Sequence, residues 1–473
     1  MCDVTTKVSD RTLGPGRRLR GFGKDLLYQP ITMEVRIMFR VESTVLRTMG
    51  LVALLLAAAI PAQGAGFLIF EQGAKAMGMA GAFTAQADDP SALFHNAGGI
   101  AFQNKRDFYL GGTLVTGQAD FSGAPPFPGS GVTEQTEKLQ ELVPHFYWIE
   151  PINDRLSFGL GLNAPFGLSV EWQDPDNFTG NYVSTLSSLT AIDLNPTIGW
   201  KATENFGIGL GLVARFSEVE LKNRQYFDDD PVFSPQIAKS KLEGGRDEGF
   251  GWNIGLLHRY NSSFHWGLQY RSKMEIDYGG ELTLNQILTG DPILDATLAF
   301  IIPFDRAIPG KTSIEFPDIA SLGLGFATSA NSWLELDVNW TGWSTFDALV
   351  VAVDSPRLPD DTPIISDLVL TQDWDDVFQY RVGFRWNSSE KSQWRIGYIY
   401  DETPQPERTV SPVLPDSNRN DFTFGYGYMG AKFNVDLALM YVKFDDRTVT
   451  ESETSYFGTY SQDAWLIAAS FGF

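Results

Sequence analysis

Histidine spacing indicates whether this chain could be a hydrolase or a metalloprotein. The four histidines are His95, His145, His258 and His265. His258 falls on the apolar face of one predicted strand and His265 on the polar face of the next, so the pair does not have the spacing of a metal site. A serine beside a histidine could form a lipase-like nucleophile, but the sequence contains no nucleophile elbow. We therefore expect no enzyme activity, no metal site and no cofactor.

Charged residues and cysteine bear on other functional classes. The acidic runs at 228–230 and 373–376 lack the regular ligand spacing of a calcium loop, which favours solvated loop charge. The formal net charge is −22, and such an acidic chain repels phosphate backbones, so nucleic acid is not an expected partner. The single cysteine is Cys2, which leaves no disulfide framework.

Apolar residues recur at every second position through most of the chain, which is the pattern of β-strands. In 206–217 large apolar side chains alternate with small or polar ones, and in 378–386 aromatic and apolar residues alternate with residues that include two arginines. A soluble sandwich gives the same rhythm. Aromatic rings opposite a charged face suit lipid outside and water inside, which favours a membrane barrel. No apolar run reaches the roughly 18 residues of a membrane-spanning helix, so only a closed sheet could span a bilayer.

The alternation predicts about fourteen strands whose connections are short and long in turn. The predicted ranges are 107–120, 139–150, 155–170, 184–200, 205–222, 250–260, 264–279, 312–328, 332–350, 374–387, 392–401, 420–429, 432–445 and 461–473. Long loops are expected at 121–138, 171–183, 223–249, 280–311, 351–373, 402–419 and 446–460. Tight turns on one side and long loops on the other are typical of bacterial outer-membrane barrels. The predicted fold is therefore all-β: an antiparallel transmembrane β-barrel of about fourteen strands, formed by residues 107–473.

Residues 1–64 are expected to be a leader outside this fold. An apolar run at 51–60 follows three arginines and precedes small residues, the pattern of a secretory signal peptide cut near positions 64–65. A buried core helix is the alternative. Because the residues before Met38 would be an unusual extension of a signal peptide, we expect translation to start at Met33 or Met38.

Residues 65–106 break the strand rhythm and are rich in glycine and alanine. Asp89 as an N-cap, with Pro90 at the first helical position, predicts one short helix. A segment of this kind ahead of a barrel could form either a periplasmic arm or a plug in the lumen.

Pro165 lies inside the predicted strand 155–170. Proline cannot donate to a strand ladder and is confined to edges and bulges. Because a closed barrel has no edge, Pro165 predicts a local break between neighbouring strands and with it a hole in the wall. A position at the rim is the alternative, since the loop begins a few residues later.

The predicted loop 280–311 is unusually apolar for an extracellular segment. Its apolar residues include Leu282, Leu284, Ile287, Leu294, Leu298 and Phe300. The dipeptide Asp291-Pro292 predicts the start of a helix. Apolar surface of this extent needs cover, which favours a groove for a greasy ligand. Packing against the 223–249 loop is the alternative, and both can hold.

Two segments near the start of the mature chain carry a family resemblance. They are Ala65-Gly66-Phe67-Leu68-Ile69-Phe70-Glu71-Gln72 and Ala87-Asp88-Asp89-Pro90-Ser91-Ala92-Leu93-Phe94-His95-Asn96, supported by Val143-Pro144-His145-Phe146 and Pro151-Ile152-Asn153-Asp154. These residues resemble the FadL-type long-chain fatty acid transporters of bacterial outer membranes, a family that includes importers of aromatic hydrocarbons. Ala97 stands where that family has the proline of an Asn-Pro-Ala motif, which leaves the role of that proline open here.

The resemblance implies a barrel in the bacterial outer membrane, plugged by a hatch at 65–106, that takes up hydrophobic compounds passively. The expected substrate is a long-chain fatty acid, which would bind the apolar groove, pass to a hatch pocket and leave sideways into the membrane lipid. The implied hatch pocket comprises Phe67, Leu68 and Phe70, the hatch motif Asp88, Asp89 and Asn96, and the lateral gate Pro165, Phe166 and Gly167. An importer of aromatic hydrocarbons, or a structural or adhesive barrel without transport, is the alternative.

Two further expectations concern charge and assembly. Arginines predicted to face the lumen could meet a substrate carboxylate, or could instead pair with Glu335 and Asp337; these arginines are Arg215, Arg381 and Arg385. The terminal Phe473 on an amphipathic last strand resembles the signal read by the barrel assembly machinery.

Overall fold

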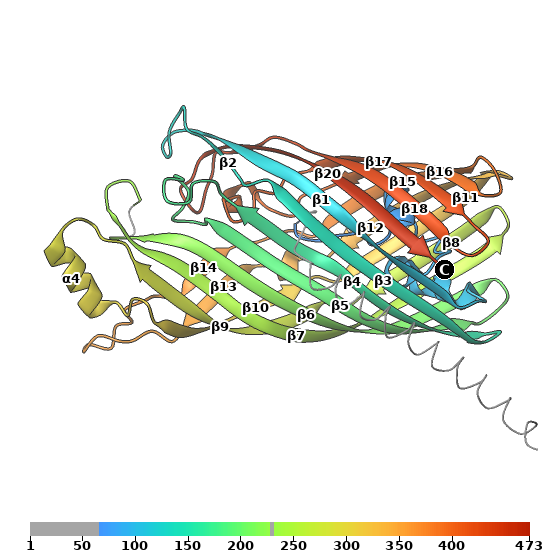
Figure 1. The fold of residues 1–473 in the computed structure, drawn as a ribbon, viewed down its shortest axis with the longest axis horizontal. Helices are drawn as coiled ribbons and strands as arrows, with labels where there is room; N and C mark the ends of the chain where they lie inside the picture. Colours follow the sequence, from blue (N-terminus) through green and yellow to red (C-terminus); the bar gives the residue numbers. More distant parts are fainter. Residues whose placement is uncertain (1–65, 228–230) are drawn as a thin grey trace, which may run out of the picture. The chain divides into compact units, whose positions relative to one another are not determined.

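The computed structural model describes residues 66–227 and 231–473, which form a closed antiparallel β-barrel of fourteen strands (Figure 1). The barrel closes where β1 (Asp107–Gly123) pairs along its length with β20 (Gly458–Gly472). The predicted leader, with its signal peptide and start codons, lies outside the described residues. No helix in the described part of the chain is both long and apolar enough to cross a bilayer.

Ten wall strands are continuous, and four are interrupted and carry two labels each. Besides β1 and β20, the continuous strands are β3 (Leu139–Asn153), β4 (Leu156–Glu171), β5 (Leu186–Lys201), β6 (Phe206–Tyr226), β7 (Gln236–Asn261), β16 (Ser392–Asp401), β17 (Arg419–Met429) and β18 (Asn434–Phe444). The interrupted ones are β8 (Phe264–Arg271) with β9 (Met274–Gln286), β10 (Ala307–Phe316) with β11 (Ile319–Ser329), β12 (Ser332–Thr341) with β13 (Ala348–Val353), and β14 (Leu368–Thr371) with β15 (Val377–Asn387). Two short strands, β2 (Thr133–Gln135) and β19 (Arg447–Val449), pair beside β1 and β20.

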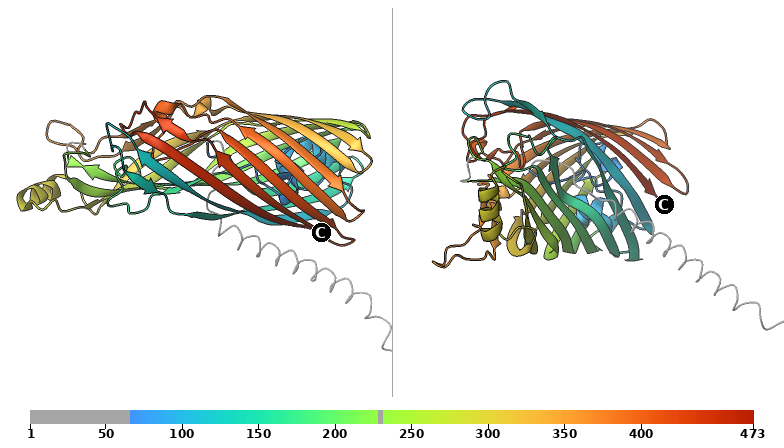
Figure 2. Two further views of the ribbon diagram at one scale, coloured as in Figure 1. Left: turned by 90° about the horizontal axis from the view of Figure 1, so that it is seen from above. Right: turned by 60° about the vertical axis from the view of Figure 1, so that its left-hand side comes forward.

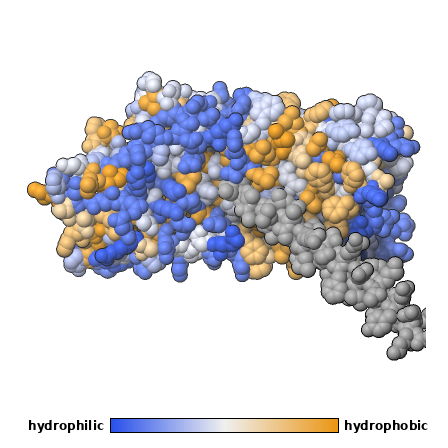
Figure 3. Space-filling view, viewed as in Figure 1, coloured by the Kyte–Doolittle hydropathy of each residue, from blue (hydrophilic) through white to orange (hydrophobic). Residues whose placement is uncertain are grey.

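At the level of the short-turn half of the wall, alternation places apolar side chains outside and polar ones in the lumen, as predicted. On β12, Leu336 and Val338 are exposed on the outer face, whereas Glu335 and Asp337 are buried inside. Apolar residues gather on the part of the wall nearer the short turns, and polar residues dominate toward the long loops (Figure 3). This arrangement fits a wall that meets lipid at one level and water above it.

One predicted loop is largely strand, and a second is strand only at its two ends. β6 and β7 extend the wall through most of 223–249, and β9 and β10 do the same at the ends of 280–311. The outer face of this extension carries charged residues such as Lys239. Because the outer face is charged and not apolar, the sequence predicts a loop here. The helix predicted from Asp291-Pro292 is present as α4 (Pro292–Ile301). Asp291 is the N-cap of this helix, and its side chain accepts a hydrogen bond from the Ile293 amide.

The hatch, residues 66–106, folds inside the lumen (Figure 2). It contains α2 (Ala74–Met77), α3 (Ala92–His95) and the 3₁₀ turn η1 (Ala97–Phe102). Of the two arrangements considered for this segment, the structure has the plug in the lumen and not the periplasmic arm. The short helix begins later than predicted, because Asp89 accepts the Ser91 amide and hydroxyl hydrogen bonds in a turn and does not cap α3.

Candidate ligand-binding site

A groove of about 580 Å³ opens at the long-loop end of the barrel, within the range of small-molecule sites. Of the residues predicted for it, Leu282 and Leu284 line the groove. The other four do not. Ile287 directly follows β9, Leu294 and Leu298 lie on α4, and Phe300, also on α4, is 90% exposed. Sequence reasoning missed most of the apolar lining, which comes from inward positions of extended strands and includes Leu221, Ile237, Ala238, Leu242, Val351, Leu368 and Leu370.

Val183 and Ser184 of the loop at 172–185 line the groove, and ion pairs anchor this loop. Asp176 lies 2.7 Å from the Arg224 guanidinium and 2.9 Å from the Lys239 ammonium, both on the β6–β7 extension. These donors, with Lys239 the stronger influence, hold the pKa of the Asp176 carboxyl below its ordinary value. The loop therefore stays ionically attached at neutral pH.

Apolar contact runs from the groove down to the start of the hatch. Leu221 packs against the groove cluster, which contains Leu242 and Leu284, and also against a second cluster that contains Phe67. Leu221 therefore joins the apolar cluster of the groove to the apolar cluster at the start of the hatch.

Phe67 lies at the centre of an aromatic pocket inside the barrel. Its ring centroid is 4.7 Å from that of Trp343, 5.5 Å from Phe346 and 5.7 Å from Trp374. The rings of Phe166 and Phe316 complete the pocket at 6.0 and 6.1 Å. Phe67 thus occupies the space that a ligand in this pocket would need.

Gly66 holds the hatch start in this pocket. Its φ is +57°, and a Cβ at this position would come within 2.5 Å of Trp374 and 2.8 Å of Trp343, so a side chain does not fit. The Gly66 amide donates a 3.0 Å hydrogen bond to the buried Asp416 carboxylate.

The barrel wall breaks beside Pro165. The pairing of β3 with β4 runs from the short turn up to Phe146, which lies opposite Leu162, and ends there. Residues 139–145 of β3 pair with β1 but have no described partner on the β4 side. The β4–β5 register also shifts between Asn163 and Phe166. Pro165 therefore lies at a break within the wall and not at the rim. Above the break the two sides meet again through the Thr136–Trp172 bridge.

Hatch residues bridge part of the break. Leu68 forms an antiparallel bridge with Phe166. The Ile69 amide donates to the Pro165 carbonyl at 2.7 Å, and the Gly167 amide donates to the Phe67 carbonyl at 2.9 Å. The residues predicted for the hatch pocket and for the gate are thus in direct contact.

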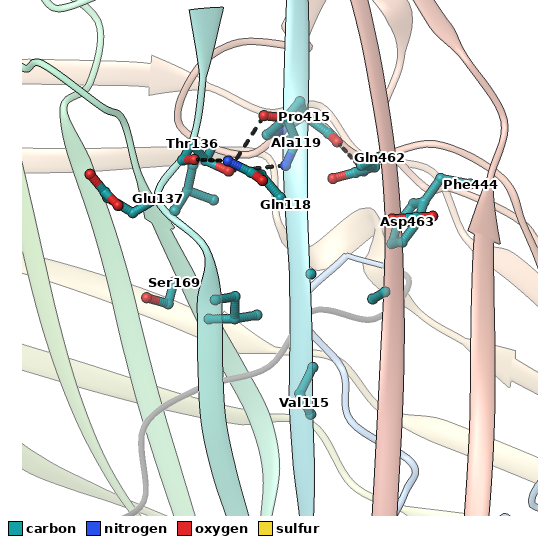
Figure 4. Close-up of a pocket in the computed structure, with 14 residues that line it drawn as sticks. Val115, Gln118, Ala119, Thr136, Glu137, Ser169, Pro415, Phe444, Gln462 and Asp463 are labelled. Atoms are coloured by element: carbon teal, nitrogen blue, oxygen red, sulfur yellow. Dashed lines mark hydrogen bonds between the residues drawn. The ribbon is translucent and has the colours of Figure 1, made fainter.

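A small cavity lies just inside the break (Figure 4). Val115 of β1 and Ser169 of β4 line it, together with Gln462 of β20. Its volume of about 30 Å³ accommodates water but no acyl chain.

Wall carboxylates hold the middle of the hatch. Asp337 accepts the amides of Phe83 and Thr84 at 3.1 and 3.0 Å, and Glu335 accepts those of Ala85 and Gln86 at 2.6 and 3.1 Å. The predicted alternative that Glu335 and Asp337 pair with lumen arginines is therefore wrong, because these carboxylates bind hatch backbone instead. Neither forms an ion pair within the described residues.

The hatch motif residues each serve local structure. Asp88 forms a 2.8 Å ion pair with Lys75. Asn96 caps η1 and donates to the carbonyl oxygens of Thr84 and Leu256, on the hatch and the wall respectively. The Ala97 amide donates to Gln269 at 3.1 Å, a bond that a proline could not form.

The three candidate lumen arginines differ in environment. Arg215 is paired with Asp193 through two hydrogen bonds of 2.7 and 2.9 Å. Arg385 stacks over Trp333. Arg381 stacks over Phe70, with its guanidinium 3.9 Å from the ring centroid, and donates to the Gly81 carbonyl.

A serine–histidine pair in the described part of the chain joins the wall to the hatch. His145 Nε2 lies 2.8 Å from Ser470 Oγ, and the same hydroxyl accepts the Ala74 amide of the hatch. Both side chains are buried. The described residues contain no cluster of three or more candidate metal ligands.

Comparison with known proteins gives a consistent result. The family model described as outer membrane protein transport protein (OMPP1/FadL/TodX) matches residues 55–473. The chain is 23% identical over 440 residues to the long-chain fatty acid transport protein of Escherichia coli O6:H1, covering 87% of this chain and 95% of that one. It is 23% identical over 430 residues to outer membrane protein P1 of Haemophilus influenzae, covering 83% and 88%.

Solved structures show the same fold. A Pseudomonas aeruginosa FadL homologue superimposes with a TM-score of 0.73 at 19% identity, over 86% of this chain and 99% of that one. The toluene transporter TbuX of Ralstonia pickettii gives 0.60 at 17% identity, over 85% and 99%.

Proposed function

This chain belongs to the family of outer membrane protein transport proteins (OMPP1/FadL/TodX), and we propose that it carries hydrophobic compounds into the bacterial outer membrane by passive diffusion, with long-chain fatty acids as substrate. The protein performs no chemistry on them. The observation that supports this role is the apolar contact from the groove, through Leu221, to the aromatic pocket of Phe67.

The proposed path has three stages. The ligand first binds the 580 Å³ groove, where each buried methylene contributes about 0.8 kcal/mol. It then displaces Phe67 from the aromatic pocket. Because Phe67 and Ile69 are hydrogen-bonded to the residues beside Pro165, this displacement opens the break between β3 and β4, and the ligand leaves sideways into lipid.

Aromatic hydrocarbons are the second candidate substrate. The pocket walls are rings of Trp343, Phe346 and Trp374, which suit an aromatic ligand, and structurally similar proteins include a toluene transporter. Mass spectrometry of compounds that co-purify with the protein would distinguish the two classes.

Saturable binding of radiolabelled oleate to the purified protein tests the proposal. Leu68→Glu places a carboxylate at the bridge with Phe166 and should abolish binding. Leu288→Glu, at an exposed leucine outside the groove, is the matched control and should bind as the wild type does. If the wild type bound neither oleate nor toluene saturably, a structural or adhesive barrel would be the better explanation.

A further inference from the structure

Trp343, in the wall of the Phe67 pocket, carries a buried hydrogen-bond donor without an acceptor. Its side chain is fully buried, and its indole N–H has no hydrogen-bond partner among the described residues. Contact with the Phe67 ring, at a centroid distance of 4.7 Å, does not replace an oxygen acceptor, because an aromatic ring accepts only weakly. An unpaired buried donor costs free energy and calls for an explanation.

Two other buried tryptophans show that the barrel interior does supply acceptors. The indole N–H of Trp172, in the same apolar cluster, donates to the Pro412 carbonyl at 3.0 Å. That of Trp333 donates to the Glu335 carboxylate at 3.1 Å. Because a buried indole N–H ordinarily finds a partner of this kind, the open donor of Trp343 departs from the usual pattern.

The donor edge of the Trp343 ring faces the start of the hatch. A Cβ on Gly66 would lie 2.8 Å from Cζ2 and 3.1 Å from Cε2 of Trp343, and Cε2 carries the indole nitrogen. Trp374 also has an unpaired indole N–H, but the same point lies 2.5 Å from its Cζ3, on the opposite edge of the ring from the nitrogen. Of these two rings, Trp343 is therefore the one whose donor edge meets the segment that a ligand must displace.

The surroundings of this donor favour a neutral acceptor over an anion. The buried Asp416 carboxylate accepts the Gly66 amide at 3.0 Å, which places a negative charge beside the same hatch residue. The Arg215 guanidinium lies 4.4 Å from the centroid of the Phe166 ring, but its charge is neutralised by two hydrogen bonds to Asp193. A carboxylate beside Trp343 would be buried without a counter-ion, so a fatty acid would enter this pocket by its hydrocarbon end.

We propose that the indole N–H of Trp343 is a specificity-determining donor for a neutral oxygenated hydrocarbon, such as a long-chain alcohol, ketone or ester, whose chain replaces the Phe67 ring. This inference rests on the proposed transport function and extends its ligands beyond fatty acids and plain hydrocarbons. Displacement of Phe67 and of the adjoining Gly66 leaves the N–H facing the ligand, and an oxygen there accepts the hydrogen bond that the free protein leaves unmade. A hydrocarbon of equal length offers no acceptor and leaves the donor unpaired.

The test compares oleyl alcohol with cis-9-octadecene, which has the same chain without the oxygen, in binding titrations on the purified protein. Trp343→Phe keeps an aromatic ring and removes the donor. We expect it to lower the ratio of the alcohol affinity to the alkene affinity by about five- to tenfold, the size of one net hydrogen bond. Trp374→Phe is the matched control, because it removes an unpaired indole N–H from the same pocket on the edge away from Gly66. It should leave the ratio within about twofold of the wild-type value.

NMR of the indole groups gives a readout that ring packing alone does not produce. In wild-type protein labelled with ¹⁵N at its tryptophans, one indole N–H proton should resonate further downfield in the complex with oleyl alcohol than in the complex with cis-9-octadecene. The resonance that Trp343→Phe removes identifies this proton.

An unchanged affinity ratio in Trp343→Phe would overturn the inference. So would an equal fall of the ratio in Trp343→Phe and Trp374→Phe, which would indicate a loss of ring packing, or identical indole shifts with the two compounds. Each of these results leaves transport of fatty acids and hydrocarbons intact. Absence of saturable binding of oleate, toluene, the alcohol and the alkene alike would instead contradict the proposed function itself.

Discussion

The Ile69 amide donates a 2.7 Å hydrogen bond to the Pro165 carbonyl, joining the first residues of the hatch to the break in the barrel wall. β4 has no β3 neighbour at this level, so the hatch supplies backbone pairing that a wall strand would otherwise provide. The aromatic pocket of Phe67 lies two residues away. One short segment of the hatch therefore contacts both the aromatic cluster and the break in the wall.

Removal of the Phe67 ring should tighten ligand binding. In Phe67→Ala the walls formed by Trp343 and Trp374 remain, but the ring that fills the pocket is gone, so a ligand no longer competes with it. Truncating a buried phenylalanine costs roughly 3 kcal/mol, part of which the ligand would recover. We expect oleate affinity to rise about tenfold in a binding titration. Phe83→Ala, at another fully buried hatch ring, should not raise the affinity. A weaker oleate affinity of Phe67→Ala would contradict competition between the Phe67 ring and the ligand.

Pro165→Val should reduce uptake while leaving binding intact. Valine supplies the amide hydrogen that proline lacks and favours a regular strand, so β4 can pair with the free edge of β3 and close the wall. We expect oleate uptake by cells lacking their own transporter to fall at least about fivefold. Pro196→Val, at a wall proline of β5 opposite Leu160, is the matched control. Unchanged uptake in Pro165→Val would exclude this break from the path.

Neutralising Glu335 and Asp337 should release the middle of the hatch. Four amides of residues 83–86 donate to these two carboxylates. Hydrogen bonds to a charged group contribute about 1.5–3 kcal/mol each, and an amide side chain replaces them only in part. In Glu335→Gln/Asp337→Asn we expect amide exchange at 83–86 to accelerate about a hundredfold, with a higher single-channel conductance. The same readouts should not change in Glu243→Gln, an exposed position on β7.

The sequence was sufficient to predict the fourteen wall strands because lipid imposes an apolar residue at every second position, as at Leu336 and Val338. Above the membrane this constraint disappears. Lys239, Lys241 and Glu243 then occupy the outer face of β7, and a strand with a charged outer face resembles a loop.

The site was only partly predictable for a different reason. Phe67, Leu68 and Pro165 could be identified from a motif and from an irregular proline. Trp343 and Trp374 could not, because they lie in interruptions between β12 and β13 and between β14 and β15, where no periodicity indicates direction.

The attachment of the 172–185 loop through Asp176 should be insensitive to mild acid. The pKa of Asp176 lies below its ordinary value of 3.8, chiefly because Lys239 and Arg224 donate to it. A lowered pKa contributes stability that is present above the ordinary value and lost as the pH falls through the folded value. Limited proteolysis of the 172–185 loop should therefore be the same at pH 7 and about pH 5.

Asp176→Asn should differ from the wild type at neutral pH. Because the carboxylate is largely solvent-exposed, we expect only about two- to fivefold faster cleavage of the loop. Asp360→Asn, an exposed aspartate on another loop, serves as the control. Acceleration of wild-type cleavage between pH 7 and about pH 5 would show that another group anchors the loop.

The terminal Phe473 should matter more for assembly than for stability. Its ring is 49% exposed on the outer face and stacks on Phe108 at a centroid distance of 5.5 Å, while its backbone exchanges two 3.0 Å hydrogen bonds with Phe108. Phe473→Ala keeps the backbone bonds and removes only a half-exposed ring contact, which contributes about 0.5–1.5 kcal/mol. Refolding into detergent micelles should therefore reach the wild-type yield.

In cells we expect the same variant to accumulate at a several-fold lower level in the outer membrane, because we propose that the barrel assembly machinery recognises the aromatic chain end. Phe473→Tyr should restore the wild-type level. Phe471→Ala removes a ring of similar exposure, 46%, from the same face two residues earlier and is the matched control. If Phe471→Ala and Phe473→Ala lowered the cellular level equally, the terminal ring would act through packing alone. An effect confined to Phe473→Ala and to cells would identify the chain end as a recognition element.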